Sequence, residues 1–599
     1  MAQINSFGFT EDPFAYTNAD EEERLSSYFV KPPYFESVTG DSNAPSTCVV
    51  LAPRGAGKSA QRRMTEEWCL KNKVLPVTYD RFEFSQGVGV REISLSYHLR
   101  NIITRALLNL MIFASENPEK IKSLPKEQRR VLNILCHNYL GDMTGQDVED
   151  AINNIKSFPQ KLKDFWNRNV GFLDSLLNFV LKTFELEKID LPAARQEEKK
   201  LNSSYKYQLE TIYSIARAFG FSSIYILIDK VDETELTGNN PENSFVLIEP
   251  LIRDLEILSL KGYGFKFFLW DQIYPFFKEA ARPDRVSQYS LTWTRGQLKS
   301  MLGERLKAFS NDKVLSLDDL INDRLLTQLD DIVTIMGWYS PRNVIRFCQE
   351  IMAEQFQINP ESDKISRRAI ELAGSKFFEK LATEQYKFES LRSLKKIDKE
   401  LFSINYLASN IFKSSGTNAR NKVIGFEKNG AIKKIGKERI ESSNKPVNLY
   451  LIIDPRLNRI INSKSPMDKF ISDRLIVCKE CNRESLIDVK HINQNCEVHC
   501  WYCDMELFSI DSVEENQNRN AIVKEIRDEI AKNRIKDAIE LLLVSFREDK
   551  EVYEEGIVLM SMLNRLELEE RVSILSSDDS HRQRNRLVFN LLELLGRIE

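Results

Sequence analysis

The chain has 599 residues, of which 42% are hydrophobic and 29% charged, and its formal net charge is −4. This composition excludes a mostly disordered chain, a collagen-like chain and a small disulfide-stapled domain. No run reaches the roughly 18 apolar residues that a membrane span needs, and the acidic start lacks the order of a signal peptide. We therefore expect a cytoplasmic protein of about four domains with no membrane partner.

Residues 46 to about 300 alternate short apolar runs with longer helical patterns, which favours an α/β core. Residues 1–45 form an acidic lead-in with one expected helix, Asp20–Tyr28, capped by Asn18 or its neighbours. The core itself is expected over residues 46–294, interrupted by a helical insertion at about 115–205. Four runs are short and apolar on both faces, as buried parallel strands are: Thr47–Ala52, Leu75–Asp80, Ile224–Asp229 and Phe265–Trp270.

A glycine-rich turn follows the first expected strand. In VVLAPRGAGKS, Val49–Ser59, the strand leads into the turn and a helical pattern begins at Ser59. Backbone N–H groups of such a turn and the helix N-terminus form an anion site, which Lys58 and the Ser59 hydroxyl extend to phosphate oxygens and Mg²⁺. Ala52 stands where the pattern G-x-x-x-x-G-K-[ST] has its first glycine, and a negative φ would make this departure inexpensive.

An acidic sequence follows the third expected strand. In IYILIDKVDE, Asp229 ends the strand, where it could hold the Mg²⁺ shell opposite the turn. Asp232 and Glu233 come next, and either could orient an attacking water. The sequence leaves the choice open, and Glu233 is favoured by analogy with hydrolytic ATPases.

APRGAGKS and ILIDKVDE together resemble the AAA+/STAND branch of P-loop NTPases, and the Asp-x-x-Asp-Glu spacing is similar to the NACHT form of that acidic motif. WYSPRNVIRFC resembles the lid helix of AAA+ proteins, which implies that Arg342 senses the γ-phosphate. LTWTRGQLKSMLGERL resembles the segment that enters that lid. The resemblance implies ATP and Mg²⁺ as cofactors, with the nucleotide held by Pro53, Arg54, Gly55, Ala56, Gly57, Lys58, Ser59 and Arg342. It also implies that Lys58, Asp232 and Glu233 are the candidate catalytic residues, and that Ser59 and Asp229 hold magnesium.

Two further roles stay open within this resemblance. Three arginines are candidates for a finger that reaches across a subunit interface: Arg282, Arg285 and Arg295. The fourth expected strand ends in Trp270-Asp271-Gln272, so Asp271 or Gln272 stands where a sensor residue is expected. This departure leaves the rate of hydrolysis open.

The lid is expected at 295–384 and a winged helix at 385–462. Between Ile411 and Arg439 the latter carries eight basic and two acidic residues. It could contact phosphates of DNA or pack on the nucleotide domain, and we favour packing because charge runs are usually solvated faces.

Five of the nine cysteines lie within Cys478–Cys503. Two CxxC pairs separated by eighteen residues fit a four-cysteine zinc pattern, and we expect a structural zinc ribbon at 475–510 held by Cys478, Cys481, Cys500 and Cys503. Three neighbours could replace a ligand: His491, Cys496 and His499. A redox CxxC is the weaker alternative.

Residues 515–599 carry about four amphipathic helices, which a plain helical bundle would also show. The run from AIELLLVSF to LVFNLLELL resembles the effector-associated domains of bacterial conflict systems, death-fold-like adaptors that pair with the same domain on an effector. We therefore expect an α/β P-loop NTPase core followed by an all-α lid, a winged helix, a zinc ribbon and a C-terminal helical bundle.

The function expected from these parts is an ATP-dependent switch in antiviral defence or signalling, a homo-oligomer that recruits an effector carrying a matching adaptor. One alternative is an origin-recognition-like ATPase that binds DNA through the winged helix and the zinc ribbon. Another is a nucleotide-gated scaffold with negligible turnover.

Overall fold

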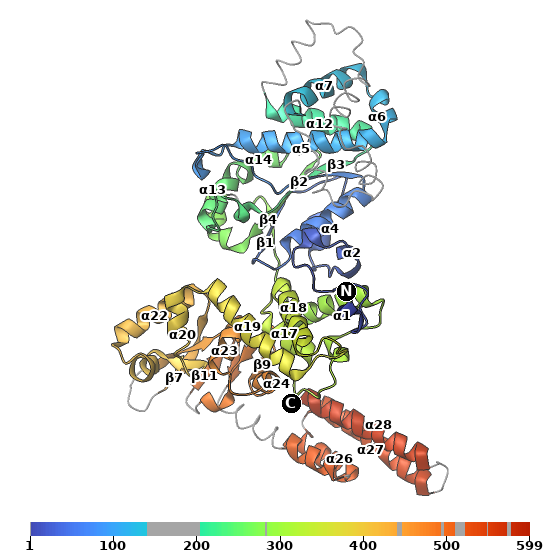
Figure 1. Ribbon diagram of the computed structural model, residues 1–599, viewed down its shortest axis with the longest axis vertical. Coiled ribbons are helices and arrows are strands. Elements are labelled where there is room, and N and C mark those ends of the chain that lie inside the picture. Colours follow the sequence, from blue (N-terminus) through green and yellow to red (C-terminus); the bar gives the residue numbers. More distant parts are fainter. Residues whose placement is uncertain are drawn as a thin grey trace. The chain divides into compact units, whose positions relative to one another are not determined.

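The computed structural model describes residues 2–140, 204–281, 284–439, 446–492, 496–508, 522–532, 534–547, 549–571 and 577–598. The chain divides into two compact units (Figure 1). The first comprises Met1–Gln385 with Asn462–Asp473, and the second Tyr386–Ile461 with Arg474–Glu599. Within the described ranges, no helix is both long and apolar enough to cross a membrane.

The first unit is built on a five-stranded parallel sheet in the order β2-β3-β4-β1-β5. The four expected strands are confirmed, with bounds that differ by one or two residues. The fifth, β5, escaped sequence analysis because SQYS is polar and only partly buried. The strands are β1 (Cys48–Ala52), β2 (Val74–Tyr79), β3 (Ser223–Ile228), β4 (Tyr263–Trp270) and β5 (Ser287–Ser290).

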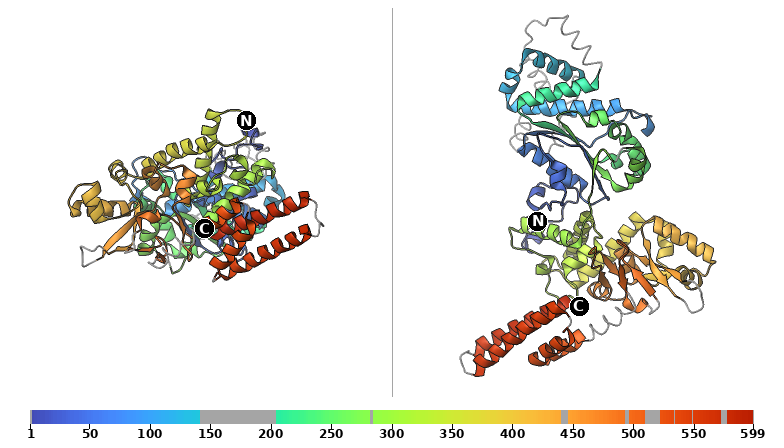
Figure 2. Two further views of the ribbon diagram at one scale, coloured as in Figure 1. Left: turned by 90° about the horizontal axis from the view of Figure 1, so that it is seen from below. Right: turned by 180° about the vertical axis from the view of Figure 1, so that it is seen from behind.

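Helices cover both faces of this sheet, as the buried strands require. Alternate residues of β1 divide between two apolar clusters: Val49 packs on the α13 side and Val50 on the α4 side. Figure 2 shows α4 and α13 on opposite faces of the strands. The covering helices are α3 (Phe35–Thr39), α4 (Lys58–Lys71), α5 (Leu95–Glu116), α12 (Tyr205–Phe219), α13 (Pro241–Ile252), α14 (Leu255–Leu258) and α15 (Tyr274–Ala280).

The lead-in contains α1 (Ala2–Asn5) and, instead of one helix at Asp20–Tyr28, two short ones: η1 (Ala19–Glu21) and α2 (Leu25–Tyr28). The side chain of Asn18 caps η1 by accepting the N–H of Asp20 at 3.1 Å, as expected. Of the expected insertion, α6 (Pro118–Ser123) and α7 (Lys126–Leu140) are described, whereas residues 141–203 lie outside the described ranges.

The helical segment after the sheet belongs to the same unit. Its helices are α16 (Arg295–Ser310), α17 (Leu329–Met336), α18 (Pro341–Ile358), α19 (Arg367–Gln385) and, from the later stretch, α24 (Met467–Ser472). Ser340 caps α18 by accepting the N–H of Asn343 at 3.3 Å, and Pro341 occupies the first turn, where a missing N–H costs nothing.

The second unit holds an antiparallel sheet in the order β12-β11-β7-β8-β6. Three of these strands come from the expected winged-helix segment and two from the cysteine segment, so one sheet runs through both. Its strands are β6 (Leu401–Ser403), β7 (Ile432–Glu438), β8 (Val447–Ile452), β11 (Cys496–His499) and β12 (Glu506–Phe508). At the β7–β11 contact a Cβ on Gly436 would lie 1.9 Å from the Glu497 carbonyl oxygen, so this position requires glycine.

The second unit also contains several helices and a small two-stranded hairpin. They are α20 (Phe388–Leu394), α21 (Ile404–Tyr406), η6 (Leu407–Ile411), α22 (Gly416–Lys428) and α23 (Pro455–Ile461), with β9 (Leu475–Val477) paired to β10 (Glu484–Leu486). The C-terminal segment is helical at 522–531, α26 (Ile535–Ser545), α27 (Lys550–Arg571) and α28 (Ser577–Ile598). The leucines at positions 559, 563, 591 and 595 belong to its own apolar core.

Candidate functional site

The phosphate loop (Ala52–Ser59) joins the end of β1 to the start of α4. Gly55 and Gly57 have φ angles of 78° and 95°, a left-handed region that favours glycine. Ala52 is instead the last, fully buried residue of β1. A strand residue needs no glycine, so the departure from the usual motif does not disturb the loop.

The carboxylate of Asp229 lies across from the loop's hydroxyl and amine. Asp229 directly follows β3 and is 1% exposed. Burial raises its pKa, while the Arg62 guanidinium, the Ser59 hydroxyl and the Lys58 ammonium oppose the rise. Lys58 Nζ lies 3.4 Å from the Ala52 carbonyl oxygen, folded back on its own loop. The structure thus brings together a hydroxyl, a carboxylate and an ammonium, a set that suits Mg²⁺ and phosphate oxygens.

Asp232 and Glu233 have different surroundings. Asp232 is 2% exposed, and its Oδ2 accepts a hydrogen bond from Arg54 Nε at 2.8 Å. Arg54 also stacks over the Trp270 ring at 4.1 Å. Glu233 faces the pocket described below; its pKa is raised by burial and by the charges of Asp232 and Asp229. Asp232 is therefore engaged in holding Arg54, and Glu233 is the one of the two that lines the pocket.

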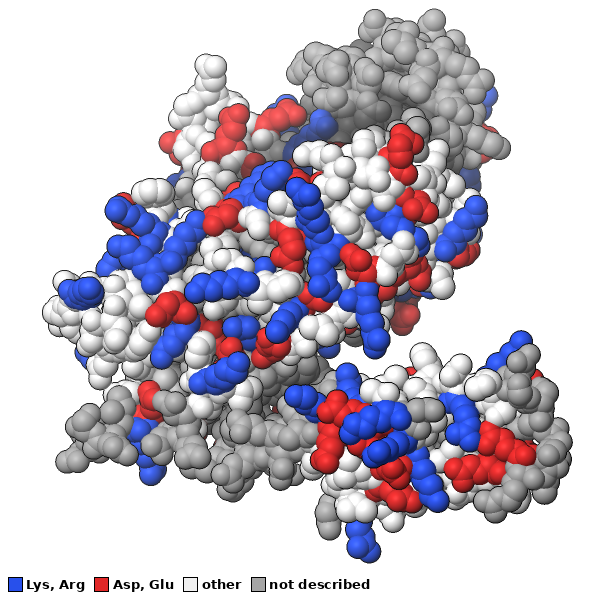
Figure 3. All heavy atoms as spheres, turned by 60° about the horizontal axis from the view of Figure 1, so that its bottom comes forward, with Lys and Arg blue, Asp and Glu red and all other residues white. Residues whose placement is uncertain are grey.

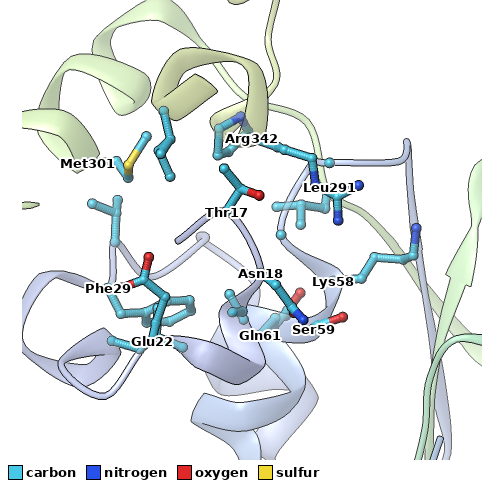
Figure 4. Close-up of a pocket in the computed structure, with 18 of the residues that line it drawn as sticks. Thr17, Asn18, Glu22, Phe29, Lys58, Ser59, Gln61, Leu291, Met301 and Arg342 are labelled. Atoms are coloured by element: carbon cyan, nitrogen blue, oxygen red, sulfur yellow. The ribbon is translucent and has the colours of Figure 1, made fainter. Parts of the chain in front are cut away.

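A pocket lies over the phosphate loop (Figure 4), with about 1040 Å³ of empty space when the part open to solvent is counted. One part is polar and takes in the loop, Asp229 and Glu233. The rest of the lining comes from the N-terminal segment (residues 17–32), which contributes polar as well as apolar side chains, from residues 291–293 and from the helical segment. Its apolar lining consists of Leu25, Tyr28, Phe29, Val30, Leu291, Trp293, Met301 and Ile345. This division suits a ligand with a flat apolar group at one end and charged oxygens at the other.

The N-terminus of α18 closes one side of this pocket. The backbone N–H of Arg342 donates to the Gly55 carbonyl oxygen at 3.3 Å, and the Ser340 hydroxyl approaches the same oxygen at 3.4 Å. Trp293 Nε1 donates to the Ala56 carbonyl oxygen at 2.8 Å. Figure 4 shows Arg342 entering from the helical segment, with Lys58 and Ser59 on the loop. Arg342 thus lines the pocket, and its expected role as a sensor of the γ-phosphate stays a prediction.

The sensor and arginine-finger candidates from the sequence have different surroundings. Burial raises the pKa of Asp271, and the nearby charge of Lys58 opposes this rise. Gln272 is exposed. Arg285 lies 3.6 Å from Asp284, and Arg295 lies 3.8 Å from Asp331. Arg282 lies outside the described residues.

Sequence reasoning missed the contribution of the N-terminal segment. Thr17, Asn18 and Glu22 line the pocket, although no motif marks them. Asp20 forms an ion pair with the buried Arg62 of α4, and its carboxylate also lies 2.6 Å from Lys230 Nζ. A local acidic run was visible in the sequence, but nothing in it indicated a partner about forty residues away.

A second site lies in the other unit, where two turns bring four cysteines together. The turn after β9 carries Cys478 and Cys481, and the turn after β11 carries Cys500 and Cys503. Their sulfur atoms all lie within 4.8 Å of one another. Cys478 and Cys503, and likewise Cys481 and Cys500, are 3.6 Å apart. Tetrahedral zinc with Zn–S bonds of about 2.3 Å places sulfurs about 3.8 Å apart, so the cluster fits Zn²⁺.

The neighbouring candidates do not join this cluster. His491 Nδ1 pairs with Glu400 Oε1 at 3.0 Å, and His499 Nε2 pairs with Glu497 at 2.9 Å. Cys496 belongs to the apolar core of the sheet. Trp501 donates from its indole nitrogen to the Glu484 carbonyl oxygen at 2.9 Å, which fixes it against the hairpin.

The comparisons with known proteins bear on the C-terminal segment most clearly. Residues 521–599 match the family model "Effector-associated domain 11". This confirms the resemblance seen in the sequence of that segment. No curated protein matches the chain.

Among solved structures, the chain resembles the ORC1 protein of Aeropyrum pernix, solved in complex with DNA. The match covers 76% of this chain and 98% of that one, with 9% sequence identity and a TM-score of 0.30. A TM-score this low does not establish a common fold.

Proposed function

We propose that the protein is an ATP-dependent switch that recruits an effector protein through its C-terminal segment. The observation that carries the proposal is the pocket over the phosphate loop, where Lys58, Ser59, Asp229 and Arg342 meet. These are the groups that a magnesium-bound triphosphate needs, and they come from three separate parts of the chain. The match of residues 521–599 to an effector-associated domain supplies the second half of the proposal.

The charged part of the pocket suits the triphosphate. The amides between Pro53 and Ser59 and the Lys58 ammonium would bind its oxygens. Ser59 and Asp229 would hold Mg²⁺, which supplies charge neutralisation at the phosphates. The apolar lining that includes Phe29 and Met301, on the side of the pocket away from Lys58 (Figure 4), suits the base.

Glu233 is our candidate for the residue that orients the attacking water. It lines the pocket, and its raised pKa indicates a carboxylate of increased basicity. Asp232 instead holds Arg54 in place. Arg342 would place a positive charge near the terminal phosphate, where charge develops as the bond breaks.

Contacts that the helical segment and the residues just before it make with the loop suit a switch. Arg342 N–H and the Trp293 indole each donate to a carbonyl oxygen of the phosphate loop. A ligand that binds one arrangement of these contacts more tightly shifts the population toward it. Hydrolysis would reverse the shift, and assembly into a homo-oligomer would multiply weak adaptor contacts.

The four-cysteine cluster is proposed to be structural. Protein thiolates would fill all four positions around a zinc ion there, which would leave none open for a substrate. Zinc there would join the β9–β10 hairpin to the turn between β11 and β12. We therefore propose that the cluster stabilises the second unit and takes no part in catalysis.

Affinity purification of the full-length protein from phage-challenged cells tests the recruitment step. We expect wild type to capture a protein that itself carries an effector-associated domain, and a chain lacking residues 515–599 to lose it. Capture by Lys58→Ala should fall as well, because that variant lacks the triphosphate contact. Equal capture by all three proteins would overturn the proposal.

Steady phosphate release distinguishes the switch from a scaffold without turnover. Release by wild type above the level of Lys58→Ala supports a hydrolysing switch. ATP binding without release supports the nucleotide-gated scaffold instead.

A further inference from the structure

Arg62 of α4 joins the candidate magnesium carboxylate to the N-terminal segment. Its Nε lies 3.2 Å from Asp229 Oδ2, and its Nη2 forms an ion pair with Oδ1 of Asp20 in η1. Asp229 directly follows β3, whereas Asp20 follows three residues that line the pocket: Thr17, Asn18 and Ala19. One guanidinium is thus shared between a carboxylate of the cation site and a carboxylate of the N-terminal segment.

Two further basic residues hold the same part of the N-terminal segment. Arg63 Nη1 donates to the Glu22 carbonyl oxygen at 2.7 Å. Lys230 Nζ lies 2.6 Å from Asp20 Oδ2, and the Lys230 backbone N–H donates to Asp229 Oδ1 at 2.9 Å. Lys230 has a φ of 58°, which is uncommon for a residue other than glycine, and in this conformation it contacts both carboxylates. Asp20 and Asp229 are therefore connected twice, through Arg62 and through Lys230.

The ion pair between Arg62 and Asp229 is shielded from water, since both side chains are 1% exposed. Over the C-terminal helices, by contrast, Figure 3 shows Lys and Arg interspersed with Asp and Glu at the surface, and in the pair Arg565–Glu569 the arginine is exposed. Water and salt screen a pair of that kind strongly. The charges around Arg62 act on one another at a lower dielectric, so a change at Asp20 is felt at Asp229.

The shared guanidinium has an electrostatic consequence for the cation site. While Asp20 is paired with Arg62, it offsets part of the guanidinium charge, and Asp229 keeps more of its negative field. If the N-terminal segment left the pocket, Asp20 would leave with it, and Arg62 would retain its pairs with Asp229 and Glu66. Asp229 would then offer a divalent cation a weaker site, because the nearby positive charge would be offset less.

We propose that the Asp20–Arg62–Asp229 linkage couples docking of the N-terminal segment to cation binding at Asp229, so that each strengthens the other. Such coupling is reciprocal: whatever holds the segment in the pocket raises the affinity for the cation, and the bound cation holds the segment. Asp20 and Arg62 are positioning residues in this role, because they act through Asp229. The coupling presupposes that the pocket binds ATP and Mg²⁺, and it makes recognition of the base and of the cation cooperative.

Trypsin cleavage after Arg24 of the full-length protein reports whether the N-terminal segment is docked. The probe is inorganic tripolyphosphate, which has no base that could contact the segment. In wild type we expect tripolyphosphate with Mg²⁺ to slow this cleavage about fivefold or more relative to tripolyphosphate in magnesium-free buffer. In Asp20→Asn the two rates should be equal, because the variant keeps the shape of the side chain without its charge. Asp20→Glu, which retains the charge, should recover part of the protection.

Glu66→Gln is the matched control. Glu66 Oε2 lies 3.4 Å from Arg62 Nη1, so this variant also removes one negative charge from the guanidinium, but Glu66 belongs to α4 and not to the N-terminal segment. Magnesium-dependent protection of Arg24 should therefore persist in Glu66→Gln. Melting temperatures check that the variants are folded. Equal loss of protection in Asp20→Asn and Glu66→Gln would overturn the proposal, because the charge of Arg62 alone would then explain the effect.

Equilibrium binding separates failure of the coupling from failure of the nucleotide assignment. In wild type the preference for ATP over tripolyphosphate should be about fivefold or more larger with Mg²⁺ than without it. In Asp20→Asn the preference should be the same under both conditions. A magnesium-dependent preference that persists in Asp20→Asn would overturn the coupling and leave the nucleotide assignment standing. Wild-type protein that binds neither compound would overturn both.

Discussion

Arg62 and Asp229 form a buried ion pair behind the phosphate loop, with Arg62 Nε 3.2 Å from Asp229 Oδ2 and both side chains 1% exposed. The same guanidinium pairs with Glu66 at 3.4 Å and with Asp20 of the N-terminal segment. One arginine therefore connects α4, the end of β3 and a segment that lines the pocket. Acids this deeply buried need their cation, because an uncompensated charge in the interior is costly.

Replacing Arg62 should destabilise the first unit strongly. Arg62→Met leaves Asp20, Glu66 and Asp229 without their shared partner, and we expect a loss of about 3–5 kcal/mol in the free energy of unfolding. Urea unfolding of the full-length protein measures it. Lys71→Met on the same helix is the control, since its pair with Glu67 is exposed and should contribute little. Equal effects of the two changes would contradict the buried network.

Lys58→Ala should abolish ATP binding without unfolding the protein. The amine has one contact with its own loop, 3.4 Å from a carbonyl oxygen, so little stability depends on it. A fluorescent ATP analogue in the presence of Mg²⁺ measures the affinity, and the melting temperature checks the fold. Lys71→Ala, farther along the same helix, should bind as wild type does. Unchanged affinity in Lys58→Ala would remove the pocket assignment.

Glu233→Gln should mainly lower phosphate release, whereas Asp232→Asn should mainly change ATP affinity. Glu233→Gln keeps the shape of the pocket and removes the carboxylate, so ATP should still bind while phosphate release falls, by about a hundredfold or more if the residue acts as base. Asp232→Asn weakens the hold on Arg54 and should mainly change ATP affinity. Single-turnover phosphate release and equilibrium binding separate the two. Reversed effects would make Asp232 the base.

Sequence reasoning found the parts of the pocket that depend on local patterns. The phosphate loop and Asp229 stand out because each follows an apolar strand, and parallel strands end at one edge of a sheet. β5 was missed because its polar residues cover little of the core. The role of Asp20 depends on a contact with Arg62, which no local pattern predicts. The choice between Asp232 and Glu233 likewise depends on which one Arg54 reaches.

In the cysteine segment, too, local spacing could be predicted from the sequence and long-range pairing could not. Spacing alone indicated which four cysteines lie together, because a CxxC turn presents two thiolates together. The sequences of the two strands gave no indication that β11 would pair with β7. This pairing requires Gly436, whose missing side chain admits the Glu497 carbonyl.

His98 should make the stability of the first unit depend on pH. It is fully buried, hydrogen-bonded to Tyr79 and Leu247, and burial lowers its pKa to about 4. In the unfolded chain the pKa is about 6.5, so as pH falls below 6.5 the unfolded state gains a proton that the folded state refuses. Stability is therefore complete above about 6.5 and declines toward pH 4.

Melting temperatures at pH 7 and pH 5 measure this decline, in which His98 accounts for at most about 2 kcal/mol. His98→Gln should show a smaller decline than wild type, although it is less stable at pH 7. His137→Gln, on the exposed side of α7, should decline as wild type does. An equal decline in both variants would show that His98 is not the group responsible.

The zinc assignment predicts that two neighbouring cysteines behave differently. Cys478→Ser removes a ligand and should lower bound zinc well below one per chain and destabilise the second unit, because metal binding and folding are coupled there. Cys496→Ser changes a buried core residue outside the cluster, so zinc should stay near one per chain even if stability falls. Elemental analysis of the purified proteins gives the stoichiometry. Wild-type protein without zinc would end the metal assignment, and loss of zinc from Cys496→Ser would place that thiol among the ligands.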